Sequence, residues 1–218
     1  VLAARASPGG IATLILPSDS SWSKGGVVAA PHAVPPAPHA DASAIANAAR
    51  VLRSGEPALI LLGRAALRAG PLAHAAAIAA ATGATVMAEV FNTRHERGRG
   101  RHPVNRIPFA VDMALAALAP FRHLILVNAE APVAFFAYPG KPGHLFPAAG
   151  TIHALAVGGE DGAAALAALA DELGARPVPA PEHPRPEPAQ GAVPPAAFAR
   201  PLSALLPDNA IVADESIT

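Results

Sequence analysis

The chain has 218 residues, is 52% apolar and carries sixteen basic and sixteen acidic side chains. A sizeable core is therefore expected, and no net field favours nucleic acid or an anionic membrane as a partner. The absence of cysteine excludes disulfide frameworks, thiolate zinc sites and cysteine nucleophiles. No apolar run reaches the roughly 18–20 residues that a membrane-spanning helix needs, so we expect a cytoplasmic protein without a membrane partner.

The amino-terminal part predicts one strand followed by a linker. Ile11–Leu16 is an apolar run that ends in the polar segment "PSDSSW". The next stretch, 24–40 ("KGGVVAAPHAVPPAPHA"), is rich in proline and has neither helical nor strand periodicity, which is typical of an extended linker. A single strand cannot form a sheet. We therefore expect this one either to join a central sheet or to belong to a neighbouring domain.

Helix and strand patterns alternate in the middle of the chain. Apolar spacing with capping residues predicts helices at 41–55, 70–83, 107–121 and 161–174. Continuous apolar runs of strand length predict buried strands at 57–63, 84–90, 123–128 and 151–157. This alternation is typical of parallel βαβ units. The predicted fold class is α/β, with a doubly wound, Rossmann-like parallel sheet over residues 41–175 and an isolated strand on either side of it.

The carboxyl-terminal part repeats the pattern of linker and lone strand. A second proline-rich stretch, 176–195, predicts a linker, with a ligand for an SH3-like partner as the alternative. A short helix at 196–206 and an apolar strand at 210–213 follow, and the strand leads into the polar loop 214–218. Ligands of open α/β folds sit at loops that follow strands, so this loop is a candidate for binding.

Two segments of the middle region could bind a nucleotide. The turn "GRAALRAG", which begins at Gly63 and Arg64, follows the first buried strand where a phosphate loop would stand, although its spacing is not G-x-G-x-x-G. The loop 93–106 holds five arginines, Arg99 and Arg101 among them, and arginine suits phosphates and carboxylates. A plain tight turn and a solvated loop are the structural alternatives. The histidines of this loop lack the spacing of a zinc site, and no metal ligand is predicted.

The most unusual loop is 130–143, "EAPVAFFAYPGKPG". It places Phe135, Phe136 and Tyr138 directly after a predicted strand, where exposed aromatic rings would be costly. We expect them to pack against a partner domain, a substrate cleft or their own sheet edge. No G-x-S-x-G elbow occurs, and no complete catalytic set can be assembled. The chain therefore offers no predicted catalytic residue.

The order of these segments resembles the middle of a thiamine diphosphate-dependent enzyme of the acetolactate synthase and benzoylformate decarboxylase type. "GGIATLILPSD" is similar to the last strand of that family's pyrimidine-binding domain, and "LPDNAIVADESIT" to the opening of its diphosphate-binding domain. The central domain is matched by "GEPALILLGRAAL", "GRHPVNR", "HLILVNAEAPVAFFAYPG" and "IHALAV". The resemblance implies a division into 1–23, the linker 24–40, the central domain 41–175, the linker 176–195 and 196–218.

The resemblance also implies a function. The intact enzyme would use thiamine diphosphate and Mg²⁺ to decarboxylate or ligate a 2-oxo acid, as a homodimer or homotetramer. Ser216, Ile217 and Thr218 would contact the cofactor's diphosphate, and Phe135, Phe136 and Tyr138 would lie near the substrate. The family's activating glutamate and its metal motif belong to the two flanking domains, beyond these residues, so we expect the chain alone to be inactive, mainly structural and without a tightly bound cofactor. "NRIPFAVD" replaces the family's flavin-binding segment, so FAD is not expected.

Overall fold

The computed structural model describes residues 1–182, 184–188, 191 and 198–214. In that part of the chain the elements are, in order, α1 (Leu2–Arg5), α2 (Ser18–Trp22), α3 (Ala42–Arg53), β1 (Ala58–Leu62), the 3-10 helix η1 (Arg64–Leu67), α4 (Ala69–Thr82), β2 (Thr85–Ala88), β3 (Asn105–Arg106), α5 (Val111–Leu118), β4 (His123–Val127), β5 (Thr151–Ala156), α6 (Gly162–Leu173) and α7 (Ala199–Leu205). None of these helices is long and apolar enough to cross a membrane.

The strands form one parallel sheet in the order β3-β2-β1-β4-β5. β1 is the central strand, because Ile60 pairs with Val86 of β2 on one side and with Ile125 of β4 on the other. All five residues of β1 are buried. A parallel sheet that is covered on both faces requires such continuously apolar strands, and this explains the run "ALILL".

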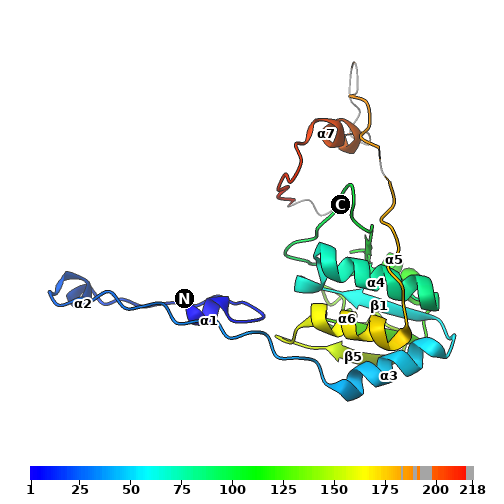
Figure 1. Cartoon of the computed structure of the whole chain (residues 1–218), viewed down its shortest axis with the longest axis horizontal. Coiled ribbons are helices and arrows are strands. Elements are labelled where there is room, and N and C mark those ends of the chain that lie inside the picture. The colour runs from blue at the N-terminus through cyan, green and yellow to red at the C-terminus, as the bar shows by residue number, and fades with distance from the viewer. Residues whose placement is uncertain (183, 189–190, 192–197, 215–218) are drawn as a thin grey trace.

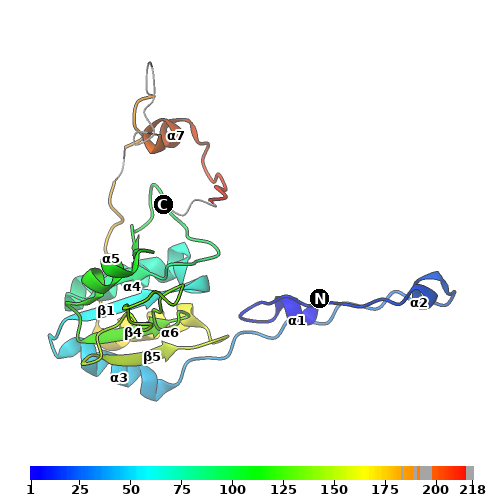
Figure 2. The ribbon, with the colours of Figure 1, turned by 180° about the vertical axis from the view of Figure 1, so that it is seen from behind.

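Helices cover both faces of the sheet (Figures 1 and 2). Successive strand residues point to opposite faces. Ile60 and Leu62 therefore pack in one cluster with α3, α4 and α6, whereas Leu59 and Leu61 pack in the other cluster with α5. The second face is completed by the loop before β5, which contributes Leu145 and Phe146. The predicted α/β doubly wound architecture is confirmed.

Capping residues set the ends of the main helices where the sequence predicts them. The Asp41 carboxylate accepts a hydrogen bond from the Ser43 amide (2.7 Å) at the start of α3, and Asp161 accepts one from the Ala164 amide (3.0 Å) at the start of α6. Such caps satisfy backbone donors that have no partner within the helix. Gly83 and Gly174 end α4 and α6 in the left-handed conformation (φ 75° and 64°), which glycine adopts without strain.

The helix predicted at 107–121 is shorter in the structure. Asn105 and Arg106 pair with Met87 and Ala88 as β3, an edge strand that the sequence pattern did not predict. The Ile107 amide donates to the Ala88 carbonyl (2.9 Å), so the backbone is still extended there. Helix α5 begins only at Val111 and ends at Leu118, before Pro120. Pairing with β2 therefore overrides the helical spacing of Ile107 and its neighbours.

The two flanking strands were predicted wrongly. Residues 11–16 and 210–213 form neither a strand nor a helix, and within the described residues no other strand lies beside them. A strand exists only with a hydrogen-bonded neighbour, and both segments lie outside the sheet. Their apolar side chains are largely exposed, Ile15 at 85% and Ile211 at 91%. Figure 1 shows the amino-terminal segment, which also carries α1 and α2, extending away from the sheet. The linker 24–40 has no helix or strand, as predicted.

We expect Ile60→Ala to lower the free energy of unfolding by about 2–5 kcal/mol, because it leaves a cavity in the centre of the sheet. The Ile60 side chain is fully buried, at 0% exposure. Urea unfolding followed by far-ultraviolet circular dichroism measures the change.

Ile15→Ala is the matched control, since it removes the same atoms from an exposed position. It should leave the unfolding free energy unchanged within about 0.5 kcal/mol. Equal losses for the two variants would contradict the described arrangement of the core.

Candidate functional site

The carboxyl ends of β1, β2 and β4 bring three residues together. Gly63 follows β1, Glu89 follows β2 and Asn128 follows β4. From β1 the chain moves outward through β2 and β3, and it then returns to β4 on the other side. This reversal is a topological switch point, where ligands of open α/β sheets bind. The candidate site therefore lies at the carboxyl ends of β1 and β4.

Gly63 is needed here for space. Its φ of −137° is open to any residue. A Cβ atom at this position would stand 2.5 Å from the Asn128 carbonyl oxygen and 2.6 Å from Oε1 of Glu89. The backbone is held by a hydrogen bond from the Gly63 amide to the Val127 carbonyl (3.1 Å). The turn is thus filled by a carboxylate, and an anionic phosphate placed there would be repelled.

Glu89 is the buried charge of this edge. Partial burial raises the pKa of Glu89 above its ordinary value, and the nearby Glu130 acts in the same direction. A hydrogen bond from the Arg64 backbone and the charge of Arg64 oppose the rise in the pKa. The Arg64 guanidinium itself pairs with Glu130 (3.3 Å) and donates weakly to the Gly158 carbonyl (3.4 Å). A half-buried carboxyl group with a perturbed pKa is typical of a functional site, although structural groups show it too.

Asn128 fastens the edge to the loop before α6. It is 4% exposed and has a left-handed φ of 50°. Its amide donates to the Ala156 carbonyl (2.8 Å) and its side-chain Nδ2 to the Glu160 carbonyl (2.9 Å). Its Oδ1 has no partner among the described residues and lies against Gly162, where a Cβ atom would be 2.1 Å away. Asn128 therefore positions the start of α6 beside the candidate site.

An aromatic cluster lies over the same edge. It consists of Phe91, Phe109, Phe135, Phe136 and Tyr138, whose successive ring centroids are 4.5–5.9 Å apart. Of the three alternatives for the aromatic loop, the ring contacts favour packing at its own sheet edge, since Phe135 contacts Phe91 after β2 and Phe109 before α5. The rings are still exposed to solvent, Phe135 at 58%. Beneath them is a cavity of about 200 Å³ that Glu89, Glu130, Leu61 and Leu145 also line.

The arginine-rich loop folds onto the start of α4. The Glu96 amide donates to the Leu67 carbonyl (3.0 Å), and the Glu96 carboxylate accepts from the Ala69 amide (2.8 Å). The same carboxylate pairs with Arg94 (3.5 Å) and Arg101 (4.0 Å). Arg99 is exposed. Of the proposed nucleotide ligands, Gly63 and Arg64 thus lie at the switch point, whereas Arg101 is engaged by Glu96.

His95, in the same loop, is half-buried. Burial lowers the pKa of His95, and the positive charges of Arg97 and Arg106 lower it further. The described residues contain no group of three or more His, Asp or Glu side chains that could hold a metal ion. Ser216, Ile217 and Thr218, the predicted diphosphate contacts, lie outside the described residues.

The sequence patterns did not single out Glu89 and Asn128. Each is the polar residue that directly follows a strand, Glu89 after β2 and Asn128 after the largely buried β4. What the sequence lacked was the strand order, which alone brings the ends of β2, β1 and β4 side by side.

Comparisons with known proteins agree with this architecture. No protein-family model matches the chain. The whole chain is 46% identical over 219 residues to the Mycobacterium tuberculosis protein named "Putative acetolactate synthase large subunit IlvX", of which it spans 42%. Two solved structures are similar in fold. The "putative thiamin diphosphate-dependent enzyme isolated from Mycobacterium smegmatis" has a TM-score of 0.58 and 24% identity over 84% of this chain and 38% of its own. The Rhodococcus jostii "thiamine diphosphate-dependent 4-hydroxybenzoylformate decarboxylase" has a TM-score of 0.51 and 18% identity over 81% and 35%.

We expect Gly63→Ala to lower the free energy of unfolding by about 1–3 kcal/mol, because the added methyl group would overlap the Asn128 carbonyl and the Glu89 carboxylate. Chemical denaturation measures the loss. Gly70→Ala is the control: it lies in α4 with no atom within 4 Å of the new Cβ. It should be neutral or stabilising by about 0.5–1 kcal/mol. Similar effects of the two variants would contradict the crowded turn.

A second prediction concerns Glu89 and pH. Since the folded-state pKa of Glu89 lies above the ordinary value of 4.5, its contribution to stability is present below pH 4.5 and is lost as the pH rises through the folded-state pKa. Glu89→Gln should therefore stabilise the protein at neutral pH, and the gain should disappear in acid. Unfolding curves at several pH values measure this. Glu187→Gln, which changes an exposed carboxylate in the second proline-rich stretch, should show no such trend. A neutral-pH loss in Glu89→Gln would contradict the buried charge.

Proposed function

We propose that this chain belongs to the thiamine diphosphate-dependent enzyme family and is the central region of a 2-oxo acid decarboxylase or carboligase of the acetolactate synthase type. The observation that carries the proposal is the 46% identity along the whole chain to the mycobacterial acetolactate synthase-like relative. The chain spans 42% of that relative's length. The activity is therefore proposed for the longer protein, and this region alone is proposed to be mainly structural.

In this proposal the flanking segments belong to the neighbouring domains. Residues 1–23 would complete the pyrimidine-binding domain and 196–218 would open the diphosphate-binding domain, with linkers at 24–40 and 176–195 and the central domain at 41–175. The exposed apolar residues support this division. Ile15 and Ile211 stand in strand-like sequences without a neighbouring strand among the described residues. Apolar segments that are exposed to this degree are usually covered by another surface.

The described residues do not fit thiamine diphosphate and Mg²⁺. They contain no group of side chains for a metal ion, and the turn that could receive a phosphate at the switch point is filled by the Glu89 carboxylate. We therefore assign the cofactor to the flanking domains, with Ser216, Ile217 and Thr218 as the proposed diphosphate contacts from this chain. The same carboxylate argues against the alternative function, a nucleotide-binding module built on Gly63, Arg64, Arg99 and Arg101, and against FAD.

The aromatic cluster is the proposed contribution of this region to the substrate site. Phe135, Phe136 and Tyr138 are exposed at the carboxyl edge, and Phe135 lines a cavity whose wall is mostly apolar. A 2-oxo acid with an apolar or aromatic side chain would bury that side chain against these rings. We propose a cytoplasmic homodimer or homotetramer, in which the central domain keeps the two catalytic domains in a fixed relation.

We expect the isolated 218-residue chain to release no carbon dioxide from pyruvate or benzoylformate when thiamine diphosphate and Mg²⁺ are supplied. The reason is that the proposal assigns the cofactor to the flanking domains, and that the described residues contain no group of side chains for a metal ion. A coupled assay of carbon dioxide release measures this, with circular dichroism of the same sample to show that it is folded.

The control is a longer polypeptide that includes the regions matching the rest of the acetolactate synthase-like relative, and it should turn over at least one 2-oxo acid. Clear turnover by the isolated chain would contradict the proposal that this region is mainly structural and that catalysis needs the longer protein. Inactivity of the longer polypeptide with every 2-oxo acid would contradict the proposed function itself.

A further inference from the structure

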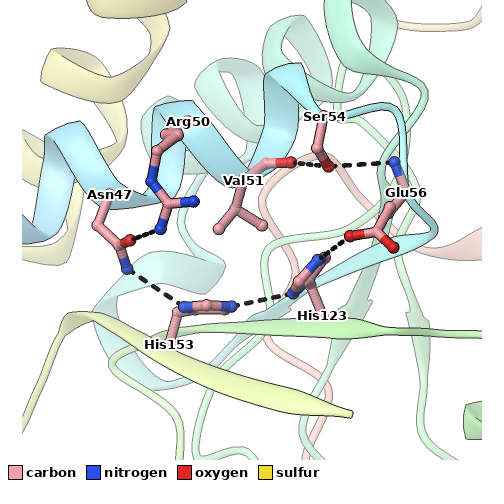
Figure 3. Close-up of polar contacts among 7 residues, drawn as sticks. All are labelled: Asn47, Arg50, Val51, Ser54, Glu56, His123 and His153. Atoms are coloured by element: carbon pink, nitrogen blue, oxygen red, sulfur yellow. Dashed lines mark hydrogen bonds and ion pairs between the residues drawn. The ribbon is translucent and has the colours of Figure 1, made fainter.

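A hydrogen-bonded chain of side chains crosses the amino-terminal edge of the sheet, opposite the candidate site (Figure 3). It consists of Arg50 and Asn47 of α3, His153 of β5, His123 of β4 and Glu56, which precedes β1. We name these five residues the histidine latch. The contacts are Arg50 Nη2 to Asn47 Oδ1 (2.5 Å), Asn47 Nδ2 to His153 Nδ1 (3.2 Å), His153 Nε2 to His123 Nδ1 (3.1 Å) and His123 Nε2 to Glu56 Oε2 (2.9 Å).

The two ends of the latch fix the direction of every hydrogen bond in it. A guanidinium can only donate, so Asn47 must turn its oxygen to Arg50 and its NH₂ group to His153. His153 Nδ1 must then accept, and its proton lies on Nε2, which donates to His123 Nδ1. His123 in turn carries its proton on Nε2 and donates it to the Glu56 carboxylate, which can only accept. Both imidazoles are therefore neutral and protonated on Nε2.

An added proton has no place in this arrangement. A proton on His153 Nδ1 would face the NH₂ group of Asn47, a contact between two donors. A proton on His123 Nδ1 would face the protonated Nε2 of His153, and moving that second proton to Nδ1 would only return the conflict to Asn47. Rotation of the Asn47 amide would relieve the conflict only by giving up the hydrogen bond from Arg50 to its oxygen. Either protonation breaks at least one bond of the latch.

Two arginines act on the titratable groups of the latch. Arg50 of α3 acts on His153, and Arg122, which precedes β4, acts on Glu56. Burial lowers the pKa of His153, and the neighbouring His123 and Arg50 lower it further. The hydrogen bond from His123 lowers the pKa of Glu56, and the charges of His123 and Arg122 add to this. Glu56 therefore keeps its accepting charge at neutral pH and below it.

The latch joins the middle of α3 to β5 at the amino-terminal edge of the sheet. α3 is the first element of the sheet-bearing body after the extended amino-terminal segment, as Figure 1 shows. Asn47 ties its middle to His153 of β5, 106 residues away in the sequence, and His153 in turn contacts His123 of β4. We propose that the histidine latch is a pH-sensitive contact, which ties the middle of α3 to the amino-terminal edge of the sheet at neutral pH and opens in acid, while the buried residues of α3 stay packed in the core.

The sign of the pH effect follows from His153. Its pKa in the folded chain lies below the ordinary value of 6.5. Stability from the latch is therefore fully present above pH 6.5 and is lost as the pH falls through the folded-state pKa of His153. The loss should be local, because the buried residues of α3 remain packed in the core cluster.

Nuclear magnetic resonance of the ¹⁵N-labelled 218-residue chain tests the latch directly. We expect His123 and His153 to show the Nε2-protonated tautomer at neutral pH, with His153 titrating below 6.5. Amide exchange protection of α3, relative to α4, should fall by about five- to tenfold for each hydrogen bond lost as the pH is lowered. The Nδ1-protonated tautomer at either histidine, or parallel changes in α3 and α4, would overturn the proposal.

Asn47→Asp is the decisive variant. Its carboxylate would replace the donor that faces His153 Nδ1 with an acceptor, so a protonated His153 would now be favoured. The pKa of His153 should rise above 6.5, and the pH dependence of α3 protection should change sign. Glu56→Gln is the milder variant: its amide oxygen still accepts from His123, so the tautomers should persist. His74→Gln, an exposed change on α4, should alter none of these signals. An unchanged His153 titration in Asn47→Asp would overturn the proposal.

Discussion

The burial of β1 on both faces is the constraint from which the rest of the structure follows. All five of its residues are buried, and their side chains alternate between two apolar clusters. Each cluster requires its own cover, so helices must lie on both sides of the sheet. A central strand must also have a neighbour on each side. The chain supplies them by moving outward from β1 to β2 and β3 and then returning to the other side of β1 to form β4. The switch point at Gly63 is therefore a consequence of the core.

Crowding at this switch point decides what the edge can accept. Gly63, the Asn128 carbonyl and the Glu89 carboxylate occupy the space that a phosphate would use in other open α/β sheets. The room that remains is the neighbouring cavity under the aromatic cluster, which is mostly apolar and carries two carboxylates, Glu89 and Glu130, at its wall. The same fold thus offers a poor phosphate site and a better site for an apolar side chain. The proposed role at a substrate pocket rests on this difference.

Local patterns predicted the elements of the body, and tertiary contacts decided what those patterns missed. The caps Asp41 and Asp161 and the glycines that end α4 and α6 act within a few residues, so their signal is in the sequence. β3 has only two residues and exists because β2 lies beside it, which no local pattern records. Glu89 and Asn128 became neighbours through strand order. The latch joins residues as far apart as Asn47 and His153, and its proton order depends on contacts at both ends.

The body of the structure and its flanking segments differ in how they bury their apolar residues. The body between α3 and α6 buries its own apolar residues, whereas Ile15 and Ile211 in the flanking segments remain exposed. These segments lack the hydrogen-bonded neighbours that would make them strands, so their final structure depends on surfaces other than the sheet described here. A flanking segment that binds another surface can affect the body only through the contacts that join the segment to the body. The amino-terminal segment is joined to the body by α3, which the latch ties to β5, and by the Pro38 carbonyl, which accepts from the Asp161 amide (2.7 Å). Protonation of His153 at the amino-terminal edge would then loosen one of these contacts, without any change at the carboxyl edge where the aromatic cavity lies.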